Sequence, residues 1–335
     1  MRKRTIFTLC IFFLIFPLTS SAKVVGEYPK EGKVINSWKG ELFPLVNGSY
    51  WRYIYSMVEK NGKVYDEYVE KWLAVSSTSY GYYKKVENYS KEKLISTLVN
   101  EYNKKREFLL SFKREQLLSL LLYNFEPTSI SESITPFYLI KFLSSPTIPH
   151  DKGVLYQEIR KADTMLLHSY FYLQYDKKEN KMHYKKSWAG KYFPIRKMKL
   201  GEKWINWTNS QGEVKKQKTP WWGIEYEVMG TDLRQLGKDN FVCYIIGIWD
   251  LSKRNGEYKR RTSYPITKLW VAPDVGIILT INDPEKEKIY IEKLIEYYRP
   301  DKNFWWYTSE KIVPDIPPYV KGVDRRPYPR LTDDE

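Results

Sequence analysis

The run FVCYIIGIW, from Phe241 to Trp249, is the stretch that decides how this sequence folds. Apolar side chains follow one another along it, so an extended segment here would bury both of its faces, as strands in the middle of a sheet do. β-Branched and aromatic residues dominate the run, and these residue types fit a pleated surface. The sequence therefore predicts a central β-strand over Phe241–Trp249.

Other β-like runs lie on both sides of this strand along the chain. The whole sequence contains 29 Tyr, 14 Phe and 12 Trp, and this aromatic content favours sheet. Asn61-Gly62 separates the first two runs and indicates a tight hairpin between them. We expect a mainly β, α+β fold, built on a curved antiparallel sheet or half-barrel. The further expected strands are Ser49–Glu59, Val64–Val75, Tyr80–Val86, Met165–Tyr175, Met182–Trp188, Gly223–Met229, Thr267–Val271, Gly276–Ile281 and Lys288–Tyr297.

A helical segment is expected to interrupt these strands. Leu94 and Leu98 belong to a run with helical spacing, and Ser90 stands before them as a candidate N-cap. A second helix is predicted over 113–123, where leucines crowd together, and prolines punctuate the residues after it. We take about residues 89–150 as a helical insertion packed on or near the concave face of the sheet. It serves either as an ordinary packing layer or as a lid over a cavity.

The two ends of the chain differ from this β region. Residues 1–22 combine a basic start, an apolar stretch and small residues ending at Ala22, which is typical of a secretory signal cleaved after that residue. The apolar stretch is shorter than the roughly 20 residues that span a bilayer, and an uncleaved anchor is the alternative. We expect an exported protein, periplasmic or extracellular. The β domain would occupy 23–300, and the proline-rich residues 301–335 would form an extended tail.

One short pattern occurs twice. Phe-Pro-Leu followed by Gly-x-x-Trp at 43–51 returns as Phe-Pro-Ile followed by Gly-x-x-Trp at 193–204. In each copy the proline ends a segment, the glycine permits a tight turn, and Trp51 or Trp204 anchors the strand that begins there. The repeat is either a decayed duplication or one way of starting a strand used twice.

Charge and cysteine content restrict the partners. The formal charge is +15 at pH 7, and the basic residues are dispersed, which is typical of a solvated, lysine-rich surface. A basic exported protein can also touch anionic lipid or an envelope protein, with any membrane association peripheral. Export and the lack of a recognition motif argue against nucleic acid. Cys10 lies in the signal, so Cys243 is left without a disulfide partner and is expected to be a buried, inert thiol.

Motifs for catalysis and for cofactor binding are missing from the sequence. It has no His-Glu-x-x-His, Gly-x-Ser-x-Gly, Cys-x-x-Cys or P-loop pattern, so we expect no enzyme and no cofactor. His168 and His183 fall on one expected hairpin. Its register places His183 opposite Gln174 and His168 opposite Ala189, so the two histidines would not share a metal ion.

A pair of carboxylates is the remaining candidate for chemistry. Glu225 and Glu227 would share one face of a strand close to Trp221 and Trp222. Paired acids beside exposed tryptophans are what a glycoside hydrolase uses. The alternative is that both glutamates form the solvent face of an amphipathic strand.

Three stretches resemble a broad set of secreted bacterial proteins of unknown function, which are similar to the lipoprotein-carrier half-barrel. They are the Phe-Pro-Leu…Gly-x-x-Trp-x-Tyr opening at 43–53, the run NFVCY at 240–244 and the run LWVAPDVGI at 269–277. The resemblance covers roughly 42–298, with 89–150 outside the usual pattern. It implies a fold and a compartment, with ligand binding by analogy and no catalytic residue. The chain differs from that pattern at Asn240, where a small residue is usual, and at Asp274, where glycine is frequent.

These observations support three functional hypotheses. The first is a non-catalytic exported protein that holds a lipid, a lipidated partner or a peptide in a concave sheet, with Trp51, Trp204 and Trp270 as candidate lining. The second is an envelope surface or assembly component that acts through its basic face and its C-terminal tail. The third is a carbohydrate-active enzyme that uses Glu225 or Glu227.

Overall fold

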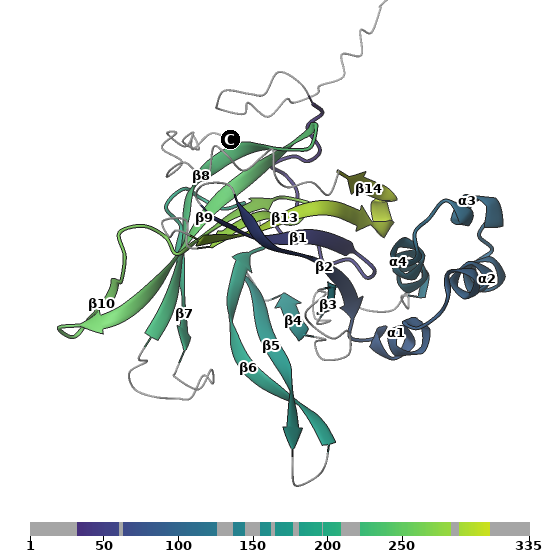
Figure 1. Ribbon diagram of the computed structural model, residues 1–335, viewed down its shortest axis with the longest axis horizontal. Coiled ribbons are helices and arrows are strands. Elements are labelled where there is room, and N and C mark those ends of the chain that lie inside the picture. The colour runs from purple at the N-terminus through teal and green to yellow at the C-terminus, as the bar shows by residue number, and fades with distance from the viewer. Residues whose placement is uncertain are drawn as a thin grey trace, which may run out of the picture.

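The computed structural model describes residues 32–59, 63–125, 137–144, 155–161, 165–176, 181–195, 197–208, 222–282 and 288–308 of the chain. Within these ranges 14 strands form one sheet, which curves and stays open, and its neighbouring strands run antiparallel (Figure 1). The mainly β fold built on a curved antiparallel sheet is therefore confirmed. The strands are β1 Tyr50–Glu59, β2 Val64–Ser76, β3 Phe137–Ser144, β4 Leu155–Lys161, β5 Met165–Asp176, β6 Lys181–Pro194, β7 Lys203–Thr208, β8 Trp222–Leu236, β9 Asp239–Arg254, β10 Glu257–Arg260, β11 Thr267–Ala272, β12 Gly276–Asn282, β13 Lys288–Arg299 and β14 Phe304–Tyr307.

The sheet is an up-and-down meander that returns to its start. Its strand order is β6-β5-β4-β3-β2-β1-β13-β12-β11-β9-β8-β7. From β1 to β6 and from β7 to β13, apart from β10, strands that follow one another along the chain are neighbours, and β13 comes back to pair with β1. β10 extends the hairpin with β9, and β14 pairs with the end of β13. The sheet ends at β6 and β7, which are consecutive along the chain.

The predicted central strand is confirmed and is longer than expected. β9 pairs with β8 on one side and with β11 on the other. Residues 241–246, six consecutive positions, are buried. Because both faces of this stretch are covered, consecutive apolar residues replace the usual alternation of apolar and polar ones.

The helical segment as a whole begins and ends earlier than predicted, although its last helix ends two residues later than the predicted 113–123. They are α1 Tyr80–Val86, α2 Lys91–Tyr102, α3 Arg106–Leu110 and α4 Arg114–Phe125. The expected strand over 80–86 is wrong, because Tyr83 and Val86 bury one helical face three residues apart. The expected helical insertion over 89–150 is wrong in its second part, because Phe137–Ser144 is β3 and pairs with both β2 and β4. The aromatic and aliphatic residues that make up most of β3 fit a sheet.

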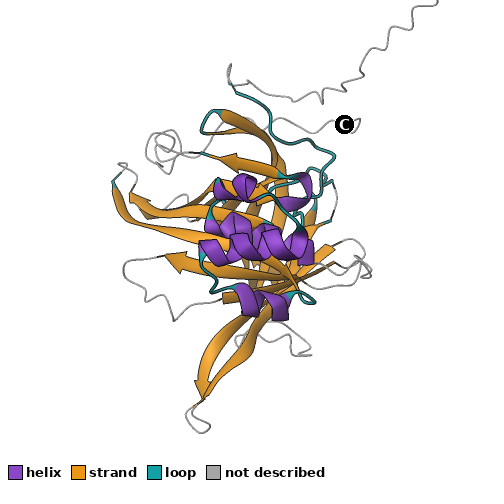
Figure 2. Cartoon of the chain, turned by 90° about the vertical axis from the view of Figure 1, so that its right-hand side faces the viewer, coloured by secondary structure: helices purple, strands orange, loops and turns teal. Residues whose placement is uncertain are grey.

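The helices pack against one face of the sheet, as Figure 2 shows. Ser90 caps α2 as predicted, because its hydroxyl accepts a hydrogen bond from the backbone N–H of Lys93 at 3.2 Å. The leucines of α4 face the same strands, so the helical segment acts as a packing layer. The strand residues in this helix–sheet cluster are Tyr50, Leu73, Val75, Ile140 and Tyr298.

The expected tail over 301–335 begins as regular structure instead. A 3-10 helix, η1, covers Pro300–Lys302, and β14 follows it. Trp306 of β14 is buried, with its ring 5.0 Å from the ring of Phe241 and its N–H 3.1 Å from the Asp239 carboxylate. This aromatic strand therefore belongs to the core. Residues 309–335, and the predicted signal at 1–22, lie outside the described residues.

The repeated Gly-x-x-Trp pattern builds the same turn twice. Gly48 has φ +87° and Gly201 has φ +76°, a region that favours glycine. The N–H of Gly48 donates to the carbonyl of Ala74 and that of Gly201 donates to the carbonyl of Val228, both at 2.8 Å. Trp51 then pairs across the sheet with Trp72, as Trp204 does with Tyr226. The matching hydrogen bonds show that both copies form the same turn, which a duplication and one way of starting a strand used twice both predict.

Candidate functional site

Trp51 and Trp204, two of the three tryptophans expected to line a groove, are buried near the starts of β1 and β7. The indole N–H of Trp51 donates to the carbonyl of Val275 at 2.6 Å. That of Trp204 donates to the carbonyl of Tyr192 at 3.1 Å. Each indole thus satisfies its polar group within the protein, as buried tryptophans do.

A chain of ring contacts connects these two tryptophans. The ring of Phe43 lies 5.4 Å from Trp51 and 5.6 Å from Tyr192. Phe193 lies 4.2 Å from Tyr192 and 6.4 Å from Trp204. The two copies of the Phe-Pro…Gly-x-x-Trp pattern therefore meet in one aromatic core, although they are far apart in the sequence.

Trp270, the third candidate, lies apart from this chain of rings. It is buried on β11, its N–H donates to the Asp232 carboxylate at 3.0 Å, and the guanidinium of Arg234 lies 5.5 Å from its ring. All three tryptophans anchor the core of the protein. That they line a ligand groove stays a prediction from the sequence.

The two end strands of the sheet are joined by side chains, and we call this the β6–β7 joint. The side-chain amide of Asn206 on β7 accepts a hydrogen bond from the backbone N–H of Lys191 and donates one to its carbonyl, both at 2.7 Å. An amide group therefore takes the place of a backbone partner. A Cβ atom on Gly190 would lie 2.8 Å from the Asn206 carboxamide oxygen, so the small residue keeps room for this contact.

Glu225 and Glu227 form an ion-pair cluster on β8. Arg260 of β10 donates hydrogen bonds to both carboxylates, and its guanidinium lies 3.7 Å from the ring centroid of Trp249. Burial disfavours the charged form of Arg260, but the hydrogen bonds to the two glutamates outweigh it and raise its pKa. Lys203 of β7 adds a contact to Glu227 at 3.4 Å.

This cluster agrees with the interpretation of the two glutamates as one outward face of a strand. Tyr226 and Val228, which alternate with them, are buried in the core. Both carboxylates are engaged by the same guanidinium, whereas a glycoside hydrolase needs two carboxyls that flank the scissile bond. Trp221 and the side chain of Trp222 lie outside the described residues.

The histidines and the cysteine take the positions that their sequence contexts indicate. His183 pairs with Gln174 as predicted, whereas a register shift in the hairpin moves His168 from Ala189 to Gly190. The two histidines are therefore not cross-strand partners. Cys243 is buried, and burial raises the pKa of its thiol, with the nearby Asp232 acting in the same direction. A thiol in this setting is unreactive.

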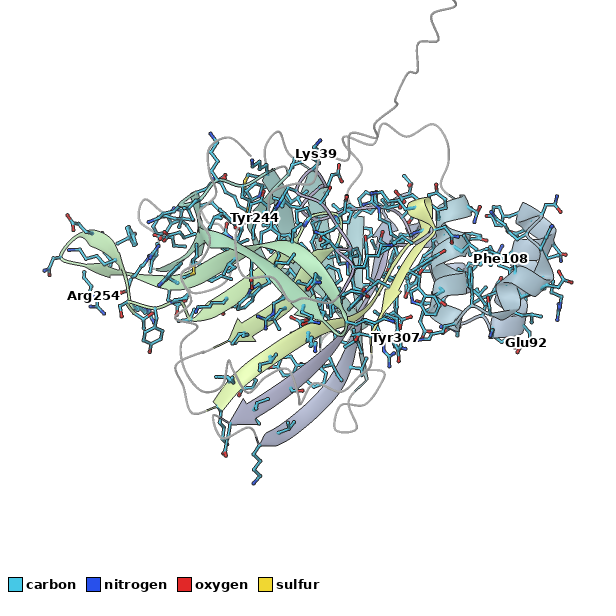
Figure 3. All side chains as sticks on the ribbon, turned by 90° about the horizontal axis from the view of Figure 1, so that it is seen from above. Lys39, Glu92, Phe108, Tyr244, Arg254 and Tyr307 are labelled. Atoms are coloured by element: carbon cyan, nitrogen blue, oxygen red, sulfur yellow. The ribbon has the colours of Figure 1, made fainter. Side chains whose placement is uncertain are left out.

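Exposed apolar side chains lie on α3 and on β14, and the residues that follow α3 link the two elements through the contacts of Phe112 and Lys113. The sequence patterns did not predict this surface. Phe108 and Leu110 of α3 are 47% and 52% exposed, and Trp305 and Tyr307 of β14 are 45% and 50% exposed. The described residues contain nine exposed large hydrophobic side chains, and these are four of them. We call these four residues, together with Lys113, the α3–β14 surface. Figure 3 shows Phe108 on the helical layer and Tyr307 on the strand beside it.

Lys113, which follows α3 by three residues along the chain, contacts the β14 part of this surface. Its ammonium group lies 4.8 Å from the ring centroid of Tyr307 and 5.8 Å from that of Trp305, at cation–π distances. It also pairs at 3.2 Å with Glu296, a carboxylate that is 1% exposed. Glu296 accepts a hydrogen bond from the indole N–H of Trp305 at 3.1 Å and lies 3.5 Å from Arg52. The exposed rings are thus held by a buried carboxylate.

Two features of the sequence could have indicated this surface. Lys104, Lys105 and Arg106 lie two to four residues before Phe108, which places a basic run close to an exposed aromatic ring in the sequence. The run FWWY at 304–307 places four aromatic residues together, and in the structure Trp306 is buried while Trp305 and Tyr307 are exposed. Neither signal stands out, because short basic runs and aromatic residues occur throughout this chain.

The part of the chain that the structure describes contains neither a candidate membrane-spanning helix nor a candidate metal site. No helix there is long and apolar enough to cross a membrane. No group of three or more His, Cys, Asp or Glu side chains in those ranges is placed to hold a metal ion.

Comparisons with known proteins give two structural neighbours. No protein-family model matches the sequence, and no curated protein matches it significantly. A candidate exported protein with a YmcC-like fold from Bacteroides fragilis covers 78% of this chain and 100% of its own, at 10% identity and a TM-score of 0.38. A candidate lipoprotein from Parabacteroides distasonis covers 76% of this chain and 97% of its own, at 10% identity and a TM-score of 0.31. At these scores neither likeness carries a functional argument.

Proposed function

We propose that this is an exported, non-catalytic β protein that works as a peripheral component of the cell envelope and docks through the α3–β14 surface. The signal-like residues 1–22 support export. The observation that supports this most directly is that four of the nine exposed large hydrophobic side chains among the described residues lie on two short elements. Exposed apolar side chains that gather in this way mark interaction sites, whereas single ones need no explanation.

The enclosed positions of the three tryptophans favour this proposal over the carriage of an apolar ligand. Trp51, Trp204 and Trp270 already have protein partners for their rings and N–H groups. A ligand would have to displace these contacts, whereas the α3–β14 surface is open in the folded chain. Ligand binding in the interior stays a prediction.

Cell fractionation tests the proposal. The full chain carrying Phe108→Ser and Trp305→Ser is compared with the wild type and with a control carrying Leu200→Ser and Tyr264→Ser, two exposed apolar residues outside this surface. We expect the wild type and the control to stay with the envelope fraction, and the first variant to move into the soluble fraction. An unchanged distribution of the first variant, with its folding confirmed by circular dichroism, would contradict the proposal.

A further inference from the structure

The residues around the α3–β14 surface are mainly basic. The segment 104–113 contains four basic residues and one acidic residue, Glu107. Lys105 and Arg106 are exposed at the start of α3. The ammonium group of Lys91 donates to the carbonyl of Leu110 at 3.0 Å, so a further cation lies beside an exposed aliphatic side chain.

The buried carboxylate under this surface does not cancel its charge. Glu296 has two cationic partners, Arg52 and Lys113, so this group of three carries one net positive charge. The ring of Tyr307 and the ring of Trp305 lie over the same lysine. Exposed Trp and Tyr rings with cations next to them are the combination that favours the boundary between lipid headgroups and acyl chains.

The short helix α3 presents two exposed apolar side chains. α3 is a five-residue helix whose Leu109 is buried while Phe108 and Leu110 on either side of it point outward. Exposed apolar residues surrounded by cations can enter the headgroup region, where hydrophobic burial and attraction to anionic lipid act together.

We propose that the α3–β14 surface binds anionic phospholipid. This inference rests on the proposed peripheral role and names its partner. Phe108, Leu110, Trp305 and Tyr307 enter the interface, and Lys104, Lys105 and Arg106 contact the headgroups. The protein therefore attaches to a leaflet without crossing it.

Vesicle sedimentation tests this proposal with the purified full chain. We expect the wild type to bind vesicles of phosphatidylcholine mixed with phosphatidylglycerol at least about tenfold more tightly than vesicles of phosphatidylcholine alone, since each cation near an anionic surface strengthens binding several-fold. Added salt should reduce this preference, because ions screen the attraction. Equal binding to both vesicles, or no binding to either, would overturn the proposal.

A charge-matched pair of variants locates the site. The triple variant Lys104→Ser, Lys105→Ser and Arg106→Ser should lose about tenfold or more in vesicle affinity. The control carries Lys253→Ser, Arg254→Ser and Arg261→Ser, three exposed basic residues near the β9–β10 hairpin at the opposite end of the molecule (Figure 3), and should bind as the wild type does. Similar losses in the two variants would assign binding to net charge alone and defeat the proposal.

The fractionation result separates this inference from the proposed function. If the Phe108→Ser and Trp305→Ser variant leaves the envelope fraction but the wild type does not bind vesicles, the partner is a protein, and the lipid proposal fails while the docking role stands. If that variant stays with the envelope, both proposals fail.

Discussion

β1 and β7 start with the same Gly-x-x-Trp turn but are held in the sheet in different ways. β1 forms a ladder with β2 on one side and ten register pairs with β13 on the other. β7 forms a ladder with β8, and its other side meets β6 through the Asn206 amide and the Trp204 indole. The comparison shows that one turn can begin both a fully paired strand and an end strand.

The pairing of β1 with β13 and the β6–β7 joint differ in their hydrogen bonds. The β1–β13 ladder is made of backbone groups, which every residue type except proline supplies and which most substitutions therefore leave in place. The β6–β7 joint depends on particular side chains, so single substitutions can open it. We therefore expect the β6–β7 joint to be less stable than the β1–β13 ladder. Four substitution experiments test this expectation, from the largest predicted effect to the smallest.

The largest expected effect is the loss of either tryptophan. Trp51→Ala should lower the free energy of unfolding by about 3–5 kcal/mol, because a large, fully enclosed ring is removed from between Phe43 and Tyr297. Trp204→Ala should cost about 1 kcal/mol less, since that ring lies at the joint. Urea unfolding measures both values. Equal losses of unfolding free energy would show that the β1–β13 ladder and the β6–β7 joint contribute equally to stability.

The second-largest effect is expected from substituting the turn glycines, and the two substitutions should differ in how much stability they cost. Gly48→Ala places a Cβ atom 2.2 Å from the backbone carbonyl oxygen of Ser119 in α4, and the strained φ adds to this clash. We expect a loss of about 2–3 kcal/mol in unfolding free energy. Gly201→Ala meets no atom within 4 Å, so only the strain of a positive φ remains, about 1 kcal/mol. Thermal unfolding of the two variants would contradict this ranking if Gly201→Ala were the more damaging.

Asn206→Ala should weaken the β6–β7 joint with a smaller effect on global stability. The backbone N–H and carbonyl of Lys191 lose their partners, which costs about 1 kcal/mol because Lys191 is exposed and water can replace them. Hydrogen exchange should quicken at Lys191 and stay unchanged in β1. Asn282→Ala, which loses one side-chain contact to Thr267 within the ladder of β11 and β12, is the control and should leave exchange in β6 unaltered. Protection of Lys191 that survives Asn206→Ala would contradict the prediction.

The smallest expected effect is that of Gly190→Ala, and it should depend on Asn206. In the wild type the new Cβ atom crowds the Asn206 carboxamide and should cost about 1 kcal/mol. In the Asn206→Ala background this crowding disappears, and alanine should be neutral or slightly stabilising, because glycine is unfavourable within strands. A double-mutant cycle measures the coupling, and additive effects would exclude the proposed contact.

The sequence predicts those parts of the fold that depend on local pattern. The consecutive apolar residues of Phe241–Trp249 identify β9, and Ser90 identifies the start of α2. The tyrosines of 80–86 indicate a strand, but β propensity depends on surroundings, and here neighbouring helices provide the partner. β14 falls within the expected tail, since four residues are too few to show a period.

The candidate sites are less predictable, since they depend on contacts between distant residues. From the sequence alone, a tryptophan can belong either to the core or to a binding surface. The ring contacts of Trp51 and Trp204 in the structure identify both as core residues. The α3–β14 surface brings Lys113 to Glu296 and Trp305, a contact that depends on how the helices pack on the sheet. The register of His183 is predictable, whereas the shift at His168 arises from an irregularity within the hairpin.

The segment that connects β6 to β7 has a consequence for how this chain could be cut and rejoined. It lies between Pro194 and Lys203, at the place where the meander lacks a ladder in the described residues. A protease nick there would break a peptide bond without separating any of the paired strands. The two fragments, each a six-stranded meander in the main strand order, would remain associated through β1 and β13. The same position offers new termini for a circularly permuted chain, or a split point for a reporter that reassembles from its halves.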